Sequence, residues 1–214
     1  MGQQQYDLLL KGGHVIDGKN SISAVRDVAI RGGRIAAVAA DIPASSAYKV
    51  VDVSGLYVTP GLIDMHVHIF AGTGERNSYA GDNSVYPDGH TFRAGVTTVV
   101  DAGSPGWRNF PDFKERIIGR SRTRVLAFLN IVGHGMRGGK IEQNTKDMDA
   151  RKTAAFALAN KDTIVGIKTA HYTAPDWIGV DRAVEAGNIA KMPVMVDFGS
   201  FRPDRKSTRL NSSH

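Results

Sequence analysis

A repeat of apolar runs after Pro60 constrains the fold more than any other feature of the chain. Five runs with the composition of buried β-strands begin about 30 residues apart, which is the size of a βαβ unit. They are LIDMHVH (62–68), VTTVVDAG (96–103), RVLAFLNIV (124–132), IVGIKTA (164–170) and PVMVDFG (193–199). Strands that are apolar along their whole length are typical of a parallel sheet covered on both faces. The repeat therefore predicts an α/β fold.

Helices are expected between these strands. Residues 110–120 and 181–192 place apolar side chains at helical spacing, and residues 149–161 are rich in alanine. Two architectures fit the pattern, namely an open doubly wound sheet and the N-terminal part of a (β/α)8 TIM-type barrel cut after its fifth strand. A whole barrel usually needs about 250 residues, whereas this chain has 214.

The region before Pro60 has a different pattern. Its β-rich runs, YDLLLKGGHVID, DVAIRGGRIAAVA and KVVDVSGLYVTP, are separated by turns that contain glycine. We therefore expect an N-terminal β-sandwich part over 1–59 and a partial barrel over 60–203. The tail over 204–214, DRKSTRLNSSH, resembles a translated sequencing adapter, and we assign it no role in function.

Composition excludes several classes of protein. No apolar run reaches the roughly 20 residues of a membrane helix, and the start shows no secretory signal, so a cytoplasmic location without a membrane partner is expected. The net charge of +6 comes partly from the tail, and the basic residues form no cluster. No nucleic-acid partner is expected. The chain has no cysteine, which excludes thiolate ligands.

Two histidines interrupt the first buried run, PGLIDMHVHIF. Positions i and i+2 of a strand face the same side, so His66 and His68 would project together while Met65 and Val67 pack on the other face. Two imidazoles aimed at one point suit a divalent metal, above all zinc. The alternative is a pair of structural histidines at the end of a strand.

Lys168 lies in the apolar run VGIKTAHY. Burial of a lysine is costly unless it is paired or neutral, and burial lowers its pKa. A neutral amine can react with carbon dioxide to give a carbamate, which is an anionic ligand. Equally, the side chain could extend to the end of the barrel or pair with a carboxylate.

The stretches GLIDMHVH, GVTTVVDAGSPG and VGIKTA, in this order and spacing, resemble the amidohydrolase superfamily, in particular its dihydroorotase-like amidohydrolases and deacetylases. The resemblance covers residues 6–203 and implies a (β/α)8 barrel with a β-sandwich. It implies that His66 and His68 bind the more buried of two metals and that carboxylated Lys168 bridges both. A hydroxide shared by the metals would be the nucleophile.

The sequence departs from that family at the end of the fifth strand. The resemblance implies a histidine ligand there, but MPVMVDFGSF has Asp197. A carboxylate can bind zinc or manganese, or it can support another ligand. The sixth-strand histidine and the general base, an aspartate of the eighth strand, would lie beyond residue 203, so no catalytic residue is assigned.

Three further residues are weaker candidates for substrate binding. Asp101 follows the second strand and either contacts substrate, orients a ligand histidine or caps the turn. His134, in the Gly-rich loop after the third strand, and His171, after Lys168, either bind substrate or are loop histidines.

The sequence thus predicts a hydrolase of C–N bonds in amides, cyclic amides or N-acyl compounds. We expect two zinc or other divalent ions per full-length protein, carbon dioxide held as a carbamate on Lys168, and a small-molecule amide substrate. The 214-residue chain is expected to be an incomplete, inactive fragment. A non-catalytic amidohydrolase-like scaffold is the alternative, and homo-oligomerisation is left open.

Overall fold

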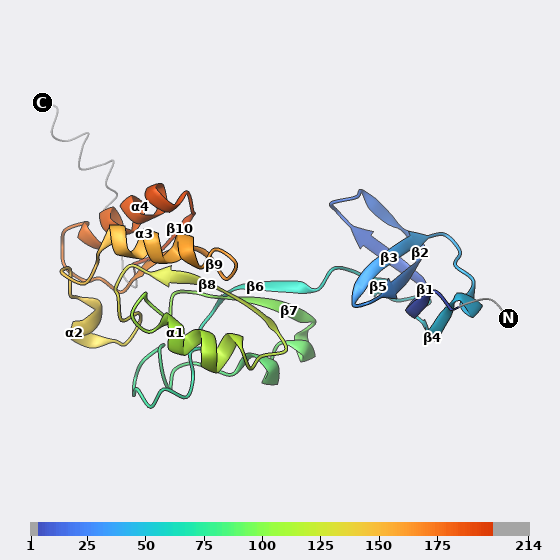
Figure 1. Ribbon diagram of the computed structural model, residues 1–214, viewed down its shortest axis with the longest axis horizontal. Coiled ribbons are helices and arrows are strands. Elements are labelled where there is room, and N and C mark those ends of the chain that lie inside the picture. The colour runs from blue at the N-terminus through green and yellow to red at the C-terminus, as the bar shows by residue number, and fades with distance from the viewer. Residues whose placement is uncertain (1–3, 199–214) are drawn as a thin grey trace, which may run out of the picture. The chain divides into compact units, whose positions relative to one another are not determined.

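The computed structural model describes residues 4–198 of the chain. The chain divides into two compact units, one that ends at Gly61 and one that begins at Leu62 (Figure 1). The predicted tail over 204–214 and the last residues of the predicted barrel segment lie outside the described residues.

The first unit is a five-stranded mixed sheet. Its strands are β1 (Tyr6–Asp17), β2 (Ile22–Arg31), β3 (Arg34–Ala39), β4 (Ala47–Asp52) and β5 (Tyr57–Val58), with a 3-10 turn at Ala44–Ser46. The order is β3-β2-β1-β4, and β5 also pairs with β1. β1, β2 and β3 are antiparallel, whereas β4 and β5 run parallel to β1. This confirms the all-β character predicted for the region.

The second unit is built on five parallel strands. They are β6 (Leu62–Val67), β7 (Val96–Asp101), β8 (Arg124–Asn130), β9 (Ile164–Ala170) and β10 (Val194–Asp197). Their order in the sheet, β10-β9-β8-β7-β6, follows the chain without a reversal. A doubly wound sheet reverses direction at a switch point, whereas a barrel wall adds each new strand to the last. The strand order therefore identifies part of a barrel and excludes the doubly wound alternative.

The predicted helices are confirmed, with differences at their ends. α1 (Phe110–Phe113) continues into a π-helical turn (Lys114–Ile118), while α3 (Ala150–Ala159) and α4 (Ile178–Ala190) lie side by side over β9 (Figure 1). The loops hold three short elements that the sequence did not reveal, namely 3-10 turns at Pro87–Gly89 and Phe92–Ala94 and helix α2 (Gly139–Glu142). Among the described helices, none is long and apolar enough to cross a bilayer.

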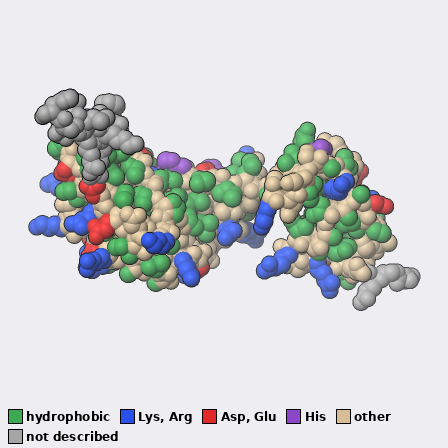
Figure 2. All heavy atoms as spheres, turned by 90° about the horizontal axis from the view of Figure 1, so that it is seen from above, with side chains coloured by type: hydrophobic (Ala, Val, Ile, Leu, Met, Phe, Trp, Pro, Cys, Tyr) green, Lys and Arg blue, Asp and Glu red, His purple; other side chains and the backbone are tan. Residues whose placement is uncertain are grey.

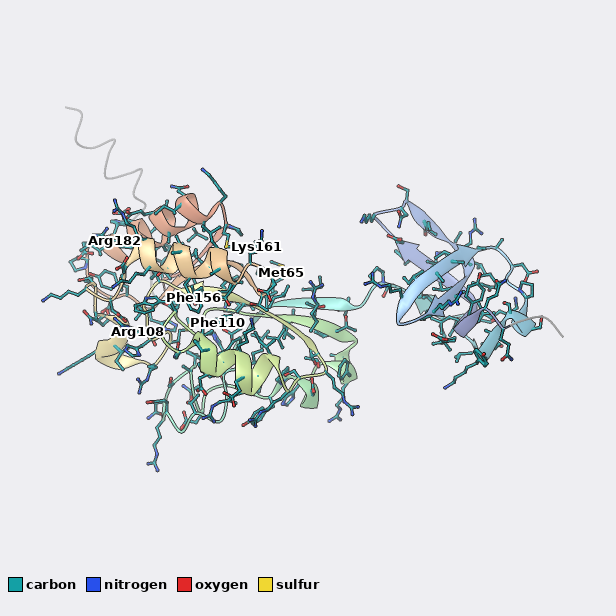
Figure 3. The ribbon with its side chains drawn as sticks, viewed as in Figure 1. Met65, Arg108, Phe110, Phe156, Lys161 and Arg182 are labelled. Atoms are coloured by element: carbon teal, nitrogen blue, oxygen red, sulfur yellow. The ribbon has the colours of Figure 1, made fainter. Side chains whose placement is uncertain are left out.

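The core of the second unit lies between the sheet and these helices. Asp149 caps α3 by accepting a hydrogen bond from the Lys152 amide, which fixes where the helix begins. The rings of Phe110 and Phe156 meet edge to face at 5.6 Å (Figure 3), so α1 and α3 share one apolar layer. This packing holds the helices on one face and leaves the carboxyl ends of the strands for polar side chains.

The buried layer gives a stability prediction. Phe110 is 1% exposed, so Phe110→Ala should lower the free energy of unfolding by about 3–5 kcal/mol through lost burial and a cavity. Phe92, which is 49% exposed, is the matched control, and Phe92→Ala should cost less than about 1 kcal/mol. Both tryptophans, Trp107 and Trp177, lie in this unit, so urea unfolding followed by tryptophan fluorescence reports on it alone. Equal losses for the two variants would contradict the assigned core.

Candidate metal centre

β6 brings the two histidines of the HxH motif together at its carboxyl end. The ring centroids of His66 and His68 are 5.8 Å apart, with the rings at 76° to one another. The register against β7 shifts between Asp64 and Val67, and the Asp64 carboxylate accepts a hydrogen bond of 3.0 Å from the His66 amide. A bulge of this kind re-aims side chains next to functional sites. Histidine side chains reach the surface of this unit in Figure 2, and His66 is among the exposed residues.

The expectation that Met65 packs on the opposite face of β6 is wrong. Met65, which is labelled in Figure 3, is 59% exposed, whereas Val67 is partly buried. The reason is that β6 is an edge strand of the described sheet, with a neighbour only on the side of β7. Strand alternation predicts which way a side chain points, but it does not predict what covers that face.

Lys168 is the most unusual residue of the second unit. Its side chain is completely buried in β9, and its amine has no hydrogen-bond partner among residues 4–198. The nearest carboxylate oxygen is Oδ2 of Asp197, at 4.0 Å. Burial lowers the pKa of the Lys168 amine, and the charges of Asp197 and Asp101 oppose this shift. A buried, unsatisfied amine is costly and requires a partner that the described residues do not supply.

A glycine on the neighbouring turn makes room for this lysine. Gly103 has φ of +92°, and a Cβ built on it would lie 2.4 Å from Cγ and 2.5 Å from Cβ of Lys168. Asn130 of β8 holds the same turn, because its side-chain amide donates to the Gly103 carbonyl at 2.9 Å. The lysine stem is therefore clamped between β8 and the turn after β7.

Asp101 shapes that turn. Its carboxylate is fully buried and accepts hydrogen bonds from the amides of Ile69 at 3.0 Å, Gly103 at 3.0 Å and Ser104 at 2.6 Å. Burial raises the pKa of Asp101 to about 6, although these three amides oppose the shift. The geometry thus supports the turn-capping interpretation of Asp101 more than direct contact with substrate.

Ser104, which the sequence analysis missed, connects this turn to the histidine pair. Its hydroxyl lies 2.9 Å from Nδ1 of His68. Such an interaction fixes the ring and leaves Nε2 as the nitrogen that can bind a metal. The pKa of His68 is lowered to about 4, mainly by burial and then by the nearby Lys168, His66 and His171. His68 is therefore neutral near pH 7, as a metal ligand must be.

Asp197 ends β10, directly beside the lysine strand. It pairs with Ala170 in the sheet register, and its backbone carbonyl accepts a hydrogen bond from the His171 amide at 3.3 Å. The structure thus gathers His66, His68, Lys168 and Asp197 at the carboxyl ends of β6, β9 and β10, which is where barrel enzymes hold their active sites.

The side chains of His66, His68 and Asp197 are chemically suited to bind a divalent metal. Imidazoles and carboxylates are ligands of zinc. However, no three histidine, aspartate or glutamate side chains within residues 4–198 lie close enough together to form a metal site by themselves. Within residues 4–198, Lys168 is the further group that could complete a metal site here, and a lysine amine becomes an anionic ligand only as a carbamate.

The two remaining candidate histidines differ in their surroundings. His171 has φ of +56°, and its Nδ1 lies 2.8 Å from Oε2 of Glu142, which raises the pKa of the imidazole. His134 is partly buried in the loop after β8, and its backbone carbonyl accepts a hydrogen bond from the Asn109 side chain. The structure therefore brings His171, but not His134, into contact with groups of the candidate centre.

Tyr79 and Glu142 also belong to this region, although the sequence analysis missed both. The Tyr79 ring lies 4.3 Å from that of His68 and 5.7 Å from that of His171, measured between centroids. Tyr79 comes from the loop between β6 and β7, whereas Glu142 ends α2. Nothing in their local sequence marks them, because one lies in a loop and the other in a four-residue helix, and only tertiary contacts bring them to this region.

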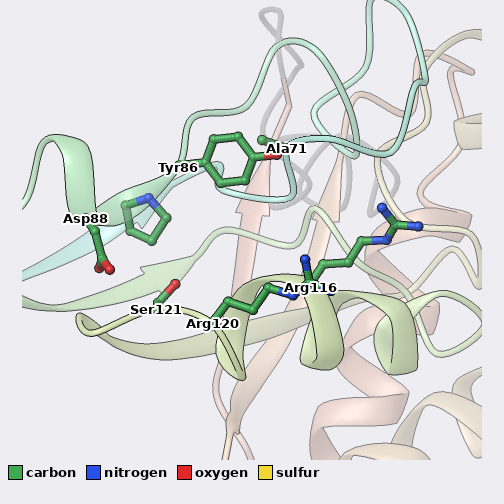
Figure 4. Close-up of a pocket in the computed structure, with 7 residues that line it drawn as sticks. Ala71, Tyr86, Asp88, Arg116, Arg120 and Ser121 are labelled. Carbon is green, nitrogen blue, oxygen red and sulfur yellow. The ribbon is translucent and has the colours of Figure 1, made fainter.

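A pocket lies on the second unit away from these residues (Figure 4). It has a volume of about 150 Å³, and Tyr86, Asp88, Arg116 and Ser121 are among its lining residues. Two of its charged groups have partners, since Arg116 pairs with Asp112 at 2.5 Å and Asp88 accepts hydrogen bonds from the amides of Arg122 and Thr123. Asp88 and Ser121 precede β7 and β8, at the amino ends of the strands, away from the face where barrels hold their active sites.

No family model matches the chain, but individual proteins and solved structures are similar to it. A deacetylase of Agrobacterium fabrum is 34% identical over 190 residues, which are 85% of this chain and 45% of the relative. The crystal structure of an adenine deaminase aligns with a TM-score of 0.78 and 28% sequence identity. The alignment covers 98% of this chain and 54% of the deaminase chain. The crystal structure of a dihydroorotase aligns with a TM-score of 0.69 and 30% sequence identity, and the alignment covers 88% of this chain and 50% of the dihydroorotase chain.

The chain spans about half the length of the curated relatives it matches. It belongs to the amidohydrolase superfamily, as its HxH motif and partial barrel indicate. The resemblance predicted from the sequence is therefore confirmed.

The close approach of Gly103 to the Lys168 side chain gives a second prediction. Gly103→Ala should destabilise the second unit by about 2–5 kcal/mol, because the new methyl group collides with Lys168 and the residue is strained at positive φ. Gly74 has a similar φ of +84° with open space around it, so Gly74→Ala isolates the backbone cost of about 1–2 kcal/mol. Urea unfolding measures both. Equal losses would mean that Lys168 does not press on this turn.

Proposed function

We propose that the whole protein is a metal-dependent hydrolase of carbon–nitrogen bonds in amides, cyclic amides or N-acyl compounds, and that His66, His68, Lys168 and Asp197 hold its metal. The observation that carries the proposal is the buried Lys168 amine, which has no hydrogen-bond partner in the described structure and lies near the histidine pair. The names of the relatives, which include deacetylases and a dihydroorotase, support the reaction class.

Carboxylation of Lys168 would resolve the cost of burying its amine. The nitrogen adds to the carbon of carbon dioxide and loses one proton to solvent, so a neutral amine becomes an anion. Burial favours this step, because it lowers the pKa of the amine and so raises the share of the unprotonated, nucleophilic form. The anion would lie near the imidazoles of His66, His68 and His171.

Each protein group has a defined task in this proposal. Zinc or another divalent ion would supply Lewis acidity and lower the pKa of water. His68 presents Nε2 because Ser104 engages Nδ1, and the ring of His66 lies 5.8 Å from that of His68, between centroids. Asp197 lies close enough to Lys168 either to bind a second ion or to hold the carbamate.

Metal content tests the proposal. Protein prepared with zinc and bicarbonate should contain one or two equivalents of metal per chain by elemental analysis. Lys168→Met, which keeps the volume of the side chain, should reduce the content by at least half. Lys161→Met changes an exposed lysine and should leave it unchanged. Circular dichroism checks that each variant is folded.

The carbamate has its own signature. Protein exposed to ¹³C-labelled bicarbonate should show a carbamate carbon by NMR, and Lys168→Met should remove that signal while Lys161→Met retains it. A folded protein with neither metal nor carbamate would overturn the proposal. It would favour the alternative of a non-catalytic scaffold, for which Asp197 in place of a histidine is the supporting observation.

A further inference from the structure

Tyr79 packs against one face of the His68 ring. The two ring centroids are 4.3 Å apart and the ring planes differ by 34°, so the rings lie nearer to stacked than to edge-on. Aromatic rings in such contact attract one another, which favours a defined orientation of each. The Ser104 hydroxyl lies 2.9 Å from Nδ1, at the edge of the same imidazole. The His68 ring is therefore contacted both on a face and on an edge.

The loop that carries Tyr79 is fastened on both sides of this residue to one carbonyl group. The Ser78 hydroxyl donates to the Met136 carbonyl at 2.8 Å, and the Ala80 amide donates to the same oxygen at 3.0 Å. Ser78, Ala80 and Met136 are each at most 1% exposed. Breaking buried hydrogen bonds is costly, because it leaves their groups unsatisfied. Tyr79, which is itself 36% exposed, thus projects from a fixed point of the loop between β6 and β7.

Ser104 connects this loop back to the histidine. The Met136 amide donates to the Ser104 carbonyl at 2.9 Å, while the Ser104 hydroxyl lies beside His68. Gly135 permits this approach, since it has φ of +67° and a Cβ built on it would collide with the Ser104 carbonyl oxygen. The contacts form a closed circuit from His68 through Ser104, Met136 and the neighbours of Tyr79 to the Tyr79 ring, which returns to His68.

Tyr79 also forms part of the wall of a pocket beside the candidate metal centre. The pocket has a volume of about 460 Å³, and Glu142 and His171 are among its other lining residues. Without the Tyr79 ring, the covered face of His68 would adjoin this pocket. The imidazole would then gain room to rotate about its Cβ–Cγ bond, away from Ser104.

We propose that Tyr79 is a positioning residue of the metal centre, because its ring, together with Ser104, holds the His68 imidazole in the orientation that presents Nε2 to the metal. This role rests on the proposed function, since it takes His68 as a ligand. Tyr79 acts through His68 and does not bind the metal itself. The flat ring performs this role, so the Tyr79 hydroxyl is dispensable.

Zinc affinity tests this role without turnover. Zinc binding to the whole protein, measured by competition with a chromophoric chelator, should weaken about 10- to 100-fold in Tyr79→Ala, as is typical when a group that orients a ligand is lost. Tyr79→Phe keeps the ring and should bind zinc as tightly as the unchanged protein. Tyr86, which is 61% exposed in the same loop, provides the matched control Tyr86→Ala, which should also leave the affinity unchanged. In cobalt-loaded protein, Tyr79→Ala alone should change the visible absorption spectrum.

The orientation of His68 can also be measured without metal. In metal-free protein with ¹⁵N-labelled histidine, under conditions where the imidazole is neutral, NMR should show His68 as one tautomer, with its proton on Nδ1 facing Ser104. Tyr79→Ala should show a mixture of both tautomers, because the ring is free to turn. Tyr79→Phe and Tyr86→Ala should retain the single tautomer. Circular dichroism checks that each variant is folded.

Three results would overturn the proposal. The first is equal zinc affinity and equal tautomer populations in Tyr79→Ala and Tyr86→Ala. The second is an equal loss in Tyr79→Ala and Tyr79→Phe, which would assign the effect to the hydroxyl. The third is weaker zinc binding with an unchanged tautomer, which would mean that Tyr79 does not act through His68.

These results are distinguishable from failure of the hydrolase proposal. Metal and carbamate in the unchanged protein, with no effect of Tyr79→Ala, refute the role of Tyr79 alone. If the unchanged protein binds no metal, the hydrolase proposal fails, and the NMR of His68 alone decides whether Tyr79 orients this ring.

Discussion

The burial of the Lys168 amine is the constraint on which the rest of the second unit depends. A charged or unsatisfied amine inside a sheet opposes folding, yet among residues 4–198 the amine has the Asp197 carboxylate at 4.0 Å and no hydrogen-bond partner. Gly103 removes a side chain to admit the lysine stem, and Asn130 and Asp101 hold the turn that contains this glycine. The turn after β7 and the end of β8 therefore accommodate one side chain of β9.

The same arrangement connects structure to chemistry. Asp101 fixes the turn, the turn presents Ser104, and Ser104 orients His68. Through Tyr79, His68 is also in contact with the wall that carries His171 and Glu142. Hydrogen bonds and ring contacts thus join the candidate metal centre to the adjacent pocket, and changes to the supporting residues are expected to act on both.

Much of the fold was predictable because its determinants are local. Apolar runs of strand length recur at regular spacing, so the strands and the three main helices were located correctly. The convergence of His66 and His68 followed from alternation along β6, but the exposure of Met65 did not, because neighbours across a sheet are not encoded within one strand. Ser104, Tyr79 and Glu142 were missed for a related reason. Each belongs to a loop or a four-residue helix, and only tertiary contacts bring it to the site.

The sequential strand order has a consequence for how the site is assembled during synthesis. Each strand of the second sheet pairs with the strand made just before it, so the sheet can grow in the direction of translation. The two histidines of β6 are placed first, whereas Lys168 and Asp197 arrive three and four strands later. Until β9 joins the sheet, the lysine amine stays in water and the cost of burying it is deferred. Among the described strands, β9 and β10 are therefore the ones that add Lys168 and Asp197 to the histidine pair.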